Sequence, residues 1–365
     1  MSTDTAGGAI ALTGPVTLAG DITVDADANN TSVTFNSTAT VNSDDASTKR
    51  DLTINTGAGA VAMQGIIGGS VALDAISINA ATAGAGTVEV ANIAGAAGAV
   101  SIGNGATATL TLDGTTYTST GAQTYEANDI NITAGADVTF TTTNSAVEFQ
   151  DGAAGQIVLS DATDLTITTS GGNITIAPTI AGTDSGGGGN TAEDITLNAA
   201  GGTVTLSNTG AAVLATEIGD VTLTGATIAL SNSITSTGTN SAGSAATIDI
   251  NGAVTLNDND ITFTTGGAGI DFSSTIVSGS TTPRALTIAQ GAGAVVINGN
   301  IGGTANNDVG NITIGATGNN GNITLSGDIG TDSVAGAAVV ALGNANTGLI
   351  TLGGAEYNTS GTQTY

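Results

Sequence analysis

The amino-acid sequence predicts an all-β fold, a parallel β-helix (β-solenoid), from its composition, its short alternating runs and its long internal repeat. Of the 365 residues, 56 are Gly, aromatic residues make up 2%, and 40% of the chain is hydrophobic. So few large rings could not fill a broad globular core, whereas small and β-branched side chains suit a thin β structure. A disordered chain would be poorer in Val, Ile and Leu.

Short apolar–Thr–apolar runs recur along the chain and have the period of two expected of strands with one buried face. Gly, Asn, Asp or Ser follows nearly every run and supplies the turns. Gly and β-branched residues interrupt every stretch that could otherwise form a helix. Examples of these runs lie at residues 15–18, 87–90, 108–112, 220–223 and 322–325.

The internal repeat is defined by its aromatic residues. The phrase Asp-Val-Thr-Phe-Thr-Thr at 137–142 returns as Asp-Ile-Thr-Phe-Thr-Thr at 260–265, and a looser copy starts at Asp21. In each copy an apolar–x–Phe phrase follows. The Phe residues of the two close copies are Phe140, Phe149, Phe263 and Phe272.

A second repeated phrase contains all four Tyr. Residues 117–125 (Tyr-Thr-Ser-Thr-Gly-Ala-Gln-Thr-Tyr) return at 357–365, so that Tyr117 and Tyr125 correspond to Tyr357 and Tyr365. We interpret these rings as structural plugs of the interior rather than exposed contact residues, because their placement repeats with the unit. Three imperfect units follow within one continuous solenoid over residues 1–365: approximately 12–125, 126–243 and 244–365.

Two all-β arrangements fit such units. Tandem β-sandwich domains, one per unit, are the alternative to a β-helix with coils of roughly 20 residues. A sandwich core needs bulky inward residues from two sheets, and a unit with at most two Phe and no Trp would fill it poorly. We therefore expect the β-helix.

The charge balance restricts the partners. Three basic residues oppose 30 acidic ones, which gives a formal net charge of −27. Nucleic acid and anionic membrane surfaces need a cationic face, so neither is expected to bind. No run approaches the length of a membrane span, the first residues do not resemble a secretory signal, and there is no Cys.

Acidic turns raise the question of calcium. Residues 25–30 open like an EF-hand loop, but Asn30 replaces its sixth-position Gly and Asn36 its closing acid. Two interpretations stay open: hydrogen-bonded Asx turns, or weak calcium binding, with no cofactor required in either case. The candidate calcium ligands are Asp25, Asp27, Asn29, Asp258 and Asp260.

We predict no catalytic residues. A polysaccharide lyase on a β-helix would need a base, and Lys49, Arg50 and Arg284 are the three basic residues. Arg50 and Arg284 occupy the same position of the repeat, as residues with a structural role would. The sequence therefore favours a protein that is not an enzyme, with a polysaccharide-acting enzyme as a remote alternative.

The phrases at 117–125, 251–256 and 291–299 resemble the strand repeats of filamentous-haemagglutinin-like giant surface proteins of Gram-negative bacteria. There, a Thr-Gly-x-Gln-Thr-Tyr-Asn-Gly-Ala-Val-Thr-Leu phrase recurs, whereas here Glu126-Ala127-Asn128 follows Tyr125. The resemblance covers essentially the whole chain. It implies a right-handed β-helix, export, and a role in adhesion, surface coating or fibre formation.

These observations together predict a structural protein of the bacterial cell surface, in which a β-solenoid forms a stalk, layer or filament. We expect end-to-end or lateral self-association and no membrane insertion. The alternative is an adhesin that binds a glycan or the surface of a host or partner cell through one solenoid face. Other surface components or glycans are further candidate partners.

Overall fold

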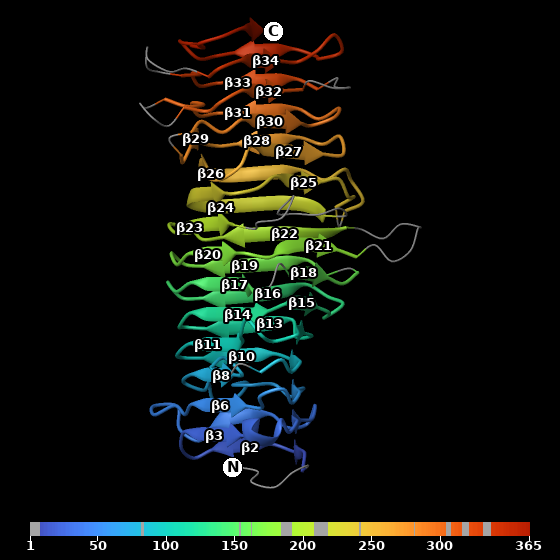
Figure 1. Cartoon of the computed structure of the whole chain (residues 1–365), viewed down its shortest axis with the longest axis vertical. Coiled ribbons are helices and arrows are strands. Elements are labelled where there is room, and N and C mark those ends of the chain that lie inside the picture. The colour runs from blue at the N-terminus through green and yellow to red at the C-terminus, as the bar shows by residue number, and fades with distance from the viewer. Residues whose placement is uncertain are drawn as a thin grey trace. The chain divides into compact units, whose positions relative to one another are not determined.

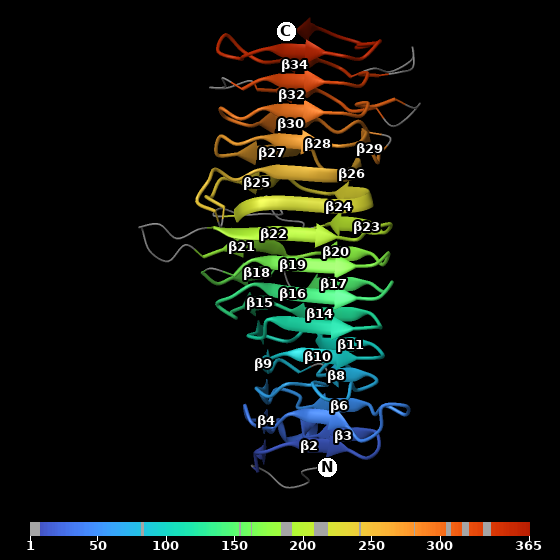
Figure 2. The ribbon, with the colours of Figure 1, turned by 180° about the vertical axis from the view of Figure 1, so that it is seen from behind.

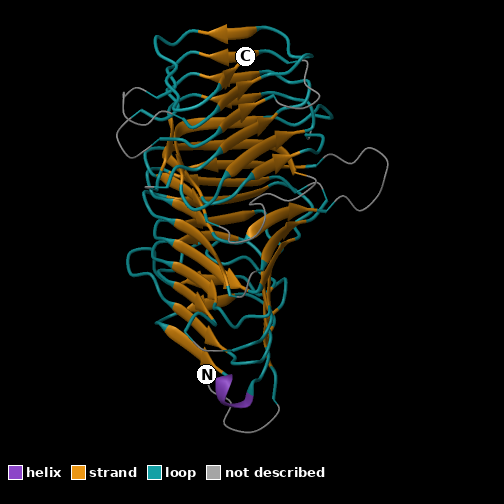
Figure 3. Ribbon diagram, turned by 45° about the horizontal axis from the view of Figure 1, so that its top comes forward, coloured by secondary structure: helices purple, strands orange, loops and turns teal. Residues whose placement is uncertain are grey.

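The computed structural model describes residues 8–81, 84–152, 155–161, 163–183, 192–207, 218–240, 242–280, 282–303, 308–315, 321–330 and 337–365. The chain divides into an N-terminal part, Met1–Pro178, and a C-terminal part, Thr179–Tyr365. Within each part, parallel strands stack coil upon coil as a β-solenoid (Figure 1). The predicted fold class is confirmed, and the sandwich alternative is wrong. Figure 3 shows the strands in orange and the three-residue 3-10 helix η1 (Asp27–Asn29) in purple.

Three parallel ladders of strands build the N-terminal part, and each coil contributes one strand to each ladder. The first ladder consists of β1 (Ile10–Leu12), β4 (Val33–Phe35), β7 (Val61–Met63), β9 (Val88–Val90), β12 (Thr109–Leu112), β15 (Asp129–Ile132) and β18 (Gln156–Leu159). The second consists of β2 (Val16–Leu18), β5 (Val41–Ser43), the single bridge residue Ile67, β10 (Ile93–Ala96), β13 (Thr116–Ser119), β16 (Val138–Thr142) and β19 (Leu165–Thr169). The third consists of β3 (Ile22–Asp25), β6 (Leu52–Asn55), β8 (Ile76–Ile78), β11 (Val100–Gly103), β14 (Gln123–Ala127), β17 (Val147–Asp151) and β20 (Ile174–Ile176).

The C-terminal part begins with β21 (Thr179–Gly182) and also has three parallel ladders; Figure 2 shows their strands from behind. The first ladder contains β22 (Glu193–Asn198), β24 (Ile218–Leu230), β26 (Ile248–Leu256), β28 (Ile270–Phe272), β31 (Val295–Ile297), β33 (Ile323–Leu325) and β35 (Ile350–Leu352). The second contains β23 (Thr203–Leu206), the second halves of the long strands β24 and β26, β29 (Ile276–Ser278) and the bridge residues Ile301, Ile329 and Tyr357. The third contains β25 (Ile234–Ser236), β27 (Ile261–Thr265), β30 (Leu286–Ala289), β32 (Ile312–Ile314), β34 (Val340–Leu342) and β36 (Gln363–Thr364).

The alternation of apolar and polar residues decides which side chains enter the interior. In most strands the residues read buried, half-buried, buried, because successive side chains point to opposite faces. Register then places each inward residue on an inward residue of the next coil: Leu52 on Ile76, and Ile76 on Val100. All three are at most 1% exposed. The core is therefore a set of apolar columns.

Coils are longer than the roughly 20 residues that we expected. Paired residues lie 20 positions apart at the shortest, between Leu110 and Ile130, and 30 positions apart between Ile22 and Leu52. The difference arises because each coil holds three strands and three connections, and the connections vary in length. In the coil that starts at β4, the connection from β4 to β5 is short, whereas the connection from β5 to β6 is the longer loop 44–51.

The sequence repeat is out of phase with the turns of the solenoid. Fourteen strand positions, counting Ile67 as one, separate β3 from β16, which carry two copies of the Asp-apolar-Thr-apolar phrase. Each turn holds three strand positions, so four turns account for twelve of the fourteen and two are left over. The copies therefore lie in different ladders, β3 in the third and β16 in the second.

The same offset holds within the C-terminal part. A degenerate copy of the Tyr phrase, Ile-Thr-Ser-Thr-Gly-Thr-Asn at residues 234–240, begins at β25 in the third ladder. The copy at Tyr357 lies fourteen positions later, in the second ladder. Successive copies of one motif therefore point in different directions around the solenoid.

Close backbone approach at the corners explains part of the Gly content. The turn residue Gly114 lies against the turn of the preceding coil. A Cβ atom added there would lie 2.6 Å from both the carbonyl carbon of Ala91 and the nitrogen of Asn92. Backbone atoms cannot move aside without breaking the ladder, so the position requires Gly.

We predict that Gly114→Ala lowers the free energy of unfolding by about 1–3 kcal/mol, because the methyl group overpacks the corner. Gly20→Ala is the matched control, since no atom lies within 4 Å of the Cβ that it would add. Denaturant unfolding followed by circular dichroism measures both. Equal stability of the two variants would contradict the proposed close approach.

Candidate functional site

Four aromatic side chains form a continuous cluster inside the N-terminal part. Tyr117 stacks on Phe140 with ring centroids 4.6 Å apart and planes 9° apart. Tyr125 stacks on Phe149 at 5.0 Å and 22°. Edge-to-face contacts between the two stacks close the cluster, and all four rings are 0% exposed. Stacked and edge-to-face pairs are the favourable aromatic geometries, so the cluster fills the interior efficiently.

A buried glutamine organises the polar atoms of this cluster. Gln123 Nε2 donates at 3.0 Å to the Tyr117 carbonyl, to Ser119 Oγ and to the Thr141 carbonyl of the next coil. Gln123 Oε1 accepts from the Tyr125 hydroxyl at 3.1 Å. Every polar atom of the Gln123 side chain has a partner, as a buried amide requires. We call Tyr117, Ser119, Gln123 and Tyr125 the Tyr–Gln–Tyr network.

Both tyrosine hydroxyls of the network are removed from water. Tyr117 Oη donates to the Val90 carbonyl at 2.9 Å and accepts from the Gly114 amide at 3.0 Å. Burial raises the pKa of Tyr117 far above that of an exposed tyrosine, and burial also raises the pKa of Tyr125. Both side chains are therefore neutral hydrogen-bonding groups over the physiological pH range.

The other predicted aromatic positions lie in the C-terminal part. Phe263 and Phe272 are 0% exposed and meet edge to face with centroids 4.9 Å apart. Tyr357 and Tyr365 lie in the last coil, where Tyr357 is half-buried and Tyr365 is 51% exposed. Of the nine aromatic residues of the chain, Tyr357 and Tyr365 alone are not buried.

A second recurring arrangement joins one coil to the next through Asp and Asn. The residue directly before a strand accepts, through Oδ1, the backbone N–H of the residue before the paired strand in the next coil. Asp21 accepts from the Asp51 amide at 3.1 Å, and Asp51 accepts from the Ala75 amide at 2.9 Å. We call these contacts inter-coil Asx bonds.

Inter-coil Asx bonds occur in both parts, and Asn serves as well as Asp. The remaining acceptors that directly precede a strand or a bridge residue, with their donors, are Asn92 with Thr115 and Thr116, Asp260 with Ala285, Asn300 with Asp328, Asn322 with Leu349, and Asp328 with Ala355 and Glu356. Three further acceptors make such bonds to the next coil from within a strand: Asn42 of β5 with Ser70 and Val71, Asp194 of β22 with Asp220, and Asp220 of β24 with Thr247. The bonds satisfy corner amides that no strand ladder reaches.

The residues predicted as calcium ligands in the first acidic turn are spread over the end of a strand and a helical turn. Asp25 ends β3 and its Oδ1 accepts from the Asp27 amide at 3.3 Å, and Asp27 and Asn29 belong to η1. Asn30 Oδ1 accepts from the Ala58 amide of the next coil at 2.7 Å.

In the second acidic turn, both predicted ligands bond to neighbouring coils. Asp258 Oδ2 accepts from Ser231 Oγ at 2.7 Å, and Asp260 Oδ1 from the Ala285 amide at 2.8 Å. Within the described ranges, no three Asp, Glu, His or Cys side chains gather as a metal site. The Asp25 contact has the form of an Asx turn, and calcium binding at the two acidic turns stays a prediction from the sequence.

Arg50 and Arg284, two of the three basic residues weighed as a catalytic base, hydrogen-bond to other residues of the fold. Arg50 Nε donates to Asp44 Oδ1 at 2.8 Å, and this hydrogen bond lowers the pKa of the Asp44 carboxyl. Arg284 Nε donates to the Asn257 carbonyl at 3.2 Å. The main-chain carbonyls of both arginines accept an amide of the next coil, from Asp74 and Gly310.

One pair of carboxylates lies side by side on an outer face of the C-terminal part. Asp249 of β26 pairs in register with Asp271 of β28. Partial burial, and then the charges of Asp271 and Asp220, raise the pKa of Asp249. Like charges opposite each other destabilise a sheet, so this pair weakens the ladder at neutral pH.

Comparison with known proteins returns no match: no protein-family model, no curated protein and no solved structure matches the chain. The resemblance to filamentous-haemagglutinin-like proteins therefore stays a prediction from the sequence phrases. Across the described segments, no helix has the length and apolar character needed to cross a bilayer.

Sequence reasoning did not identify Gln123 or the inter-coil Asx bonds. The signals were present: Gln is kept within the Tyr phrase at both 123 and 363, and an Asp or Asn directly precedes many of the apolar–Thr–apolar runs. A polar residue kept inside an otherwise apolar column indicates a hydrogen-bonded network.

We predict that Asp51→Ala lowers the free energy of unfolding by about 1–3 kcal/mol, because the Ala75 amide loses its acceptor. Asp51→Asn keeps Oδ1 and should lose less than half as much, since Asn already has this role at Asn42 and Asn92. Denaturant unfolding measures both variants. Equal losses would show that the carboxylate charge, not the hydrogen bond, is what matters.

Stability should fall at alkaline pH. The folded-state pKa values of Tyr117 and Tyr125 lie above the unfolded value of about 10, so only the unfolded chain releases these protons above that pH. Each buried tyrosine therefore removes about 1.4 kcal/mol of stability per pH unit above pH 10. Unfolding curves at several pH values measure the slope, which should flatten in the double variant Tyr117→Phe/Tyr125→Phe. An unchanged slope would contradict the burial of both hydroxyls.

Proposed function

We propose that this chain is a structural, non-enzymatic protein of the bacterial cell surface, in which the β-solenoid forms part of a stalk, surface layer or filament. The observation that supports this most strongly is where the repeated residues lie. Seven of the nine aromatic residues that define the repeat enter the interior: all five Phe, Tyr117 and Tyr125 are at most 2% exposed, whereas Tyr357 and Tyr365 are not buried. Most of the aromatic residues that recur from unit to unit are therefore core residues of the solenoid, as expected of a structural protein.

The offset between repeat and coil supports the same proposal. Successive copies of one phrase lie in different ladders, as β3 and β16 do. Duplication of the unit therefore extends the solenoid without building a row of identical sites along one face. A ligand-binding face or a flat threonine array would need the opposite arrangement, with each copy in the same ladder.

The outer surface fits a protein that works in contact with solvent. Outward positions of the strands are mostly Thr, Ser, Asn and Ala, and the net charge is −27. One sign of charge keeps a repetitive β protein soluble and opposes random lateral aggregation. The cell-surface location rests on the sequence resemblance to haemagglutinin-like proteins.

The adhesin alternative is not favoured by a specific observation. Recognition of a glycan by a solenoid face would draw on exposed aromatic side chains, and Tyr357 and Tyr365 are the aromatic residues that are not buried. Both belong to the edge of the last coil rather than to an outer face.

The proposed location is tested on intact cells of the source organism with an antibody raised against residues 1–365. We expect gold label on the outer surface, along fibres or a layer, and loss of the label after brief protease treatment of whole cells. An antibody to a ribosomal protein is the control for cell integrity. Label that appears only after lysis would contradict the proposal.

A further inference from the structure

Asparagine followed directly by glycine occurs at residues 104–105, 251–252, 298–299 and 320–321, and the structure describes both residues of the first three pairs. In such a pair the backbone nitrogen of the glycine can attack the side-chain carbonyl carbon of the asparagine, because glycine has no side chain to obstruct the approach. The attack requires the two atoms to come within about 3.5 Å of each other in a suitable orientation. The three described pairs differ in whether the fold allows this approach.

At Asn104 a turn holds both the side chain and the peptide group that follows it. Asn104 Nδ2 donates to the Asn79 carbonyl at 2.5 Å, and Oδ1 accepts from the Ala106 amide at 2.8 Å. The Asn104 carbonyl accepts from the Thr107 amide at 2.8 Å. Bringing the Gly105 nitrogen to the side-chain carbonyl would break these hydrogen bonds, so this pair is protected.

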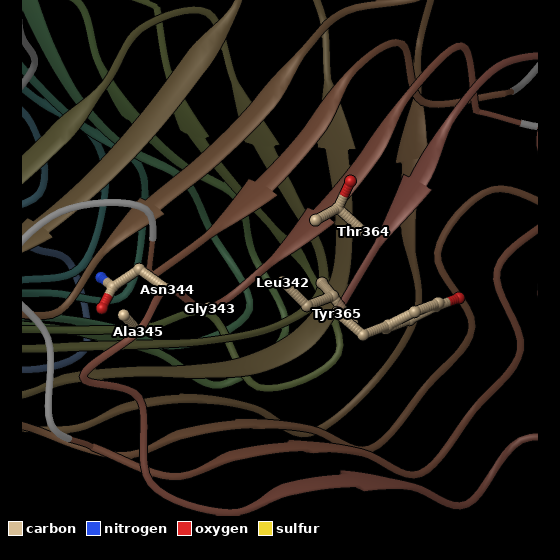
Figure 4. Close-up of a pocket in the computed structure, with 6 residues that line it drawn as sticks. All are labelled: Leu342, Gly343, Asn344, Ala345, Thr364 and Tyr365. Carbon is tan, nitrogen blue, oxygen red and sulfur yellow. The ribbon is translucent and has the colours of Figure 1, made fainter.

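The same protection recurs in the C-terminal part at Asn344, whose side chain is drawn in Figure 4. Asn344 Oδ1 accepts from the Asn346 amide at 2.7 Å, and Nδ2 donates to the Gly315 carbonyl at 2.8 Å. The bonds have the same pattern as those of Asn104. This turn therefore fixes an asparagine side chain wherever it occurs.

Asn251 is exposed but lies within the long strand β26, where it pairs with Thr224. The extended backbone of a strand rotates the nitrogen of the next residue, Gly252, away from the asparagine side chain. The ladder on which β26 lies opposes the rotation that would bring the two groups together. This pair is therefore also protected, although its side chain is open to water.

At Asn298 neither form of protection is present. Asn298 directly follows β31 and is exposed, and its Oδ1 accepts from Ser326 Oγ at 3.4 Å, longer than a typical hydroxyl hydrogen bond. Within the described residues, Asn298 Nδ2, the Asn298 carbonyl and the Gly299 N–H have no hydrogen-bond partner. Rotation of the peptide group between the two residues therefore breaks no hydrogen bond.

We propose that Asn298–Gly299 is a site of spontaneous covalent modification, at which the Gly299 nitrogen displaces the side-chain amide of Asn298 and isoaspartate replaces the asparagine. The contrast with Asn104 and Asn251 supports this assignment, because the fold protects those two pairs and leaves this one free to react. The inference concerns the chemical lifetime of one coil and does not rest on the proposed function.

The reaction needs water and no other reagent. The Gly299 nitrogen loses its proton to hydroxide and forms a bond to Cγ of Asn298, while the bond between Cγ and Nδ2 breaks and ammonia leaves with a proton from water. The cyclic imide that results then takes up one water molecule. Opening at the main-chain carbonyl gives isoaspartate, in which the main chain runs through Cβ and Cγ, whereas opening at Cγ gives aspartate.

Isoaspartate lengthens the main chain at a packed corner. A Cβ atom added to Gly299 would lie 2.3 Å from the Ser274 carbonyl carbon, so Gly299 has no room to move toward the preceding coil. The next residue bonds to both neighbouring coils: the Asn300 carbonyl accepts from the Ile276 amide at 2.9 Å, and Asn300 Oδ1 accepts from the Asp328 amide at 2.9 Å. The modification therefore weakens the contacts of this coil on both sides.

The test is peptide mapping by mass spectrometry after the purified chain has been stored for several weeks at physiological temperature and mildly alkaline pH. In the folded chain we expect at least about ten-fold more product at Asn298 than at Asn104 or Asn251, a ratio that about 1.4 kcal/mol of activation free energy produces. The rate at Asn298 should rise with pH, because hydroxide removes the proton of the attacking nitrogen.

The same chain stored in urea is the control for intrinsic reactivity. Asn251 is the matched site, since Ile precedes both it and Asn298 in the sequence, and in urea the two should react at similar rates. Two results would overturn the proposal: equal conversion of Asn298, Asn104 and Asn251 in the folded chain, or no conversion of Asn298 in the folded chain when the chain in urea reacts. Neither result bears on the surface location, which the antibody label tests separately.

The variant Asn298→Ser tests the consequence for the coil. Serine suits this position, because Ser273 and Ser326 occupy it in the two neighbouring coils, directly after β28 and β33. Fresh samples of the variant and of the natural sequence should unfold at similar urea concentrations. After storage, the natural sequence should unfold at lower urea in proportion to its isoaspartate content, whereas the variant should keep its transition. Equal losses in the two stored samples would contradict the proposed weakening of the coil.

Discussion

The stacking of each inward side chain on its counterparts in the coils above and below is the constraint on which the rest of the structure depends. The interior receives one layer of side chains from each of three strands, so a column such as Leu52, Ile76 and Val100 has no other way to exclude water. Because protein interiors are close-packed, a change in the volume of an inward side chain in one coil forces side chains in both neighbouring coils to repack. Large rings therefore come in consecutive coils: Tyr117 lies on Phe140, and Tyr125 on Phe149.

The same constraint decides how polar groups are accommodated. Corner amides lie outside the strand ladders, and a side chain of the preceding coil is the nearest acceptor. Asp51 and its equivalents supply it, and Asn42 and Asn92 do the same without a charge. Inside the cluster, Gln123 joins two coils by bonding to Tyr117 and Thr141. Many acidic residues of this chain are thus parts of the coil corners, and their charge contributes to solubility as well.

The sequence was sufficient to predict the fold class, because alternation and repetition are local signals. Of the aromatic residues expected in the interior, Tyr357 and Tyr365 are not buried. The strand at 138–142 shows the alternation: its period of two indicates that Val138 and Phe140 point to one side. The period does not say which of three faces a strand occupies, since that depends on the lengths of all preceding connections. Coil length was accordingly underestimated, and the offset between copies such as β3 and β16 was not foreseen. The hydrogen bonds of Asp51 and Gln123 were not predicted either. Asp51 bonds to the Ala75 amide and Gln123 to the Thr141 carbonyl, and both partners lie in the next coil, whose register depends on the lengths of the connections.

The most direct test of the coil register uses a pair of spin labels in the N-terminal part. Ser101 pairs with Thr124, and Thr124 pairs with Glu148, so Ser101 and Glu148 lie two strand spacings apart, about 10 Å between Cα atoms. These two residues belong to different sequence repeat units, 12–125 and 126–243. Labels on Ser101→Cys and Glu148→Cys in one chain should give strong dipolar broadening in continuous-wave electron paramagnetic resonance spectra. Spectra without broadening would contradict the solenoid and place the two units in separate domains.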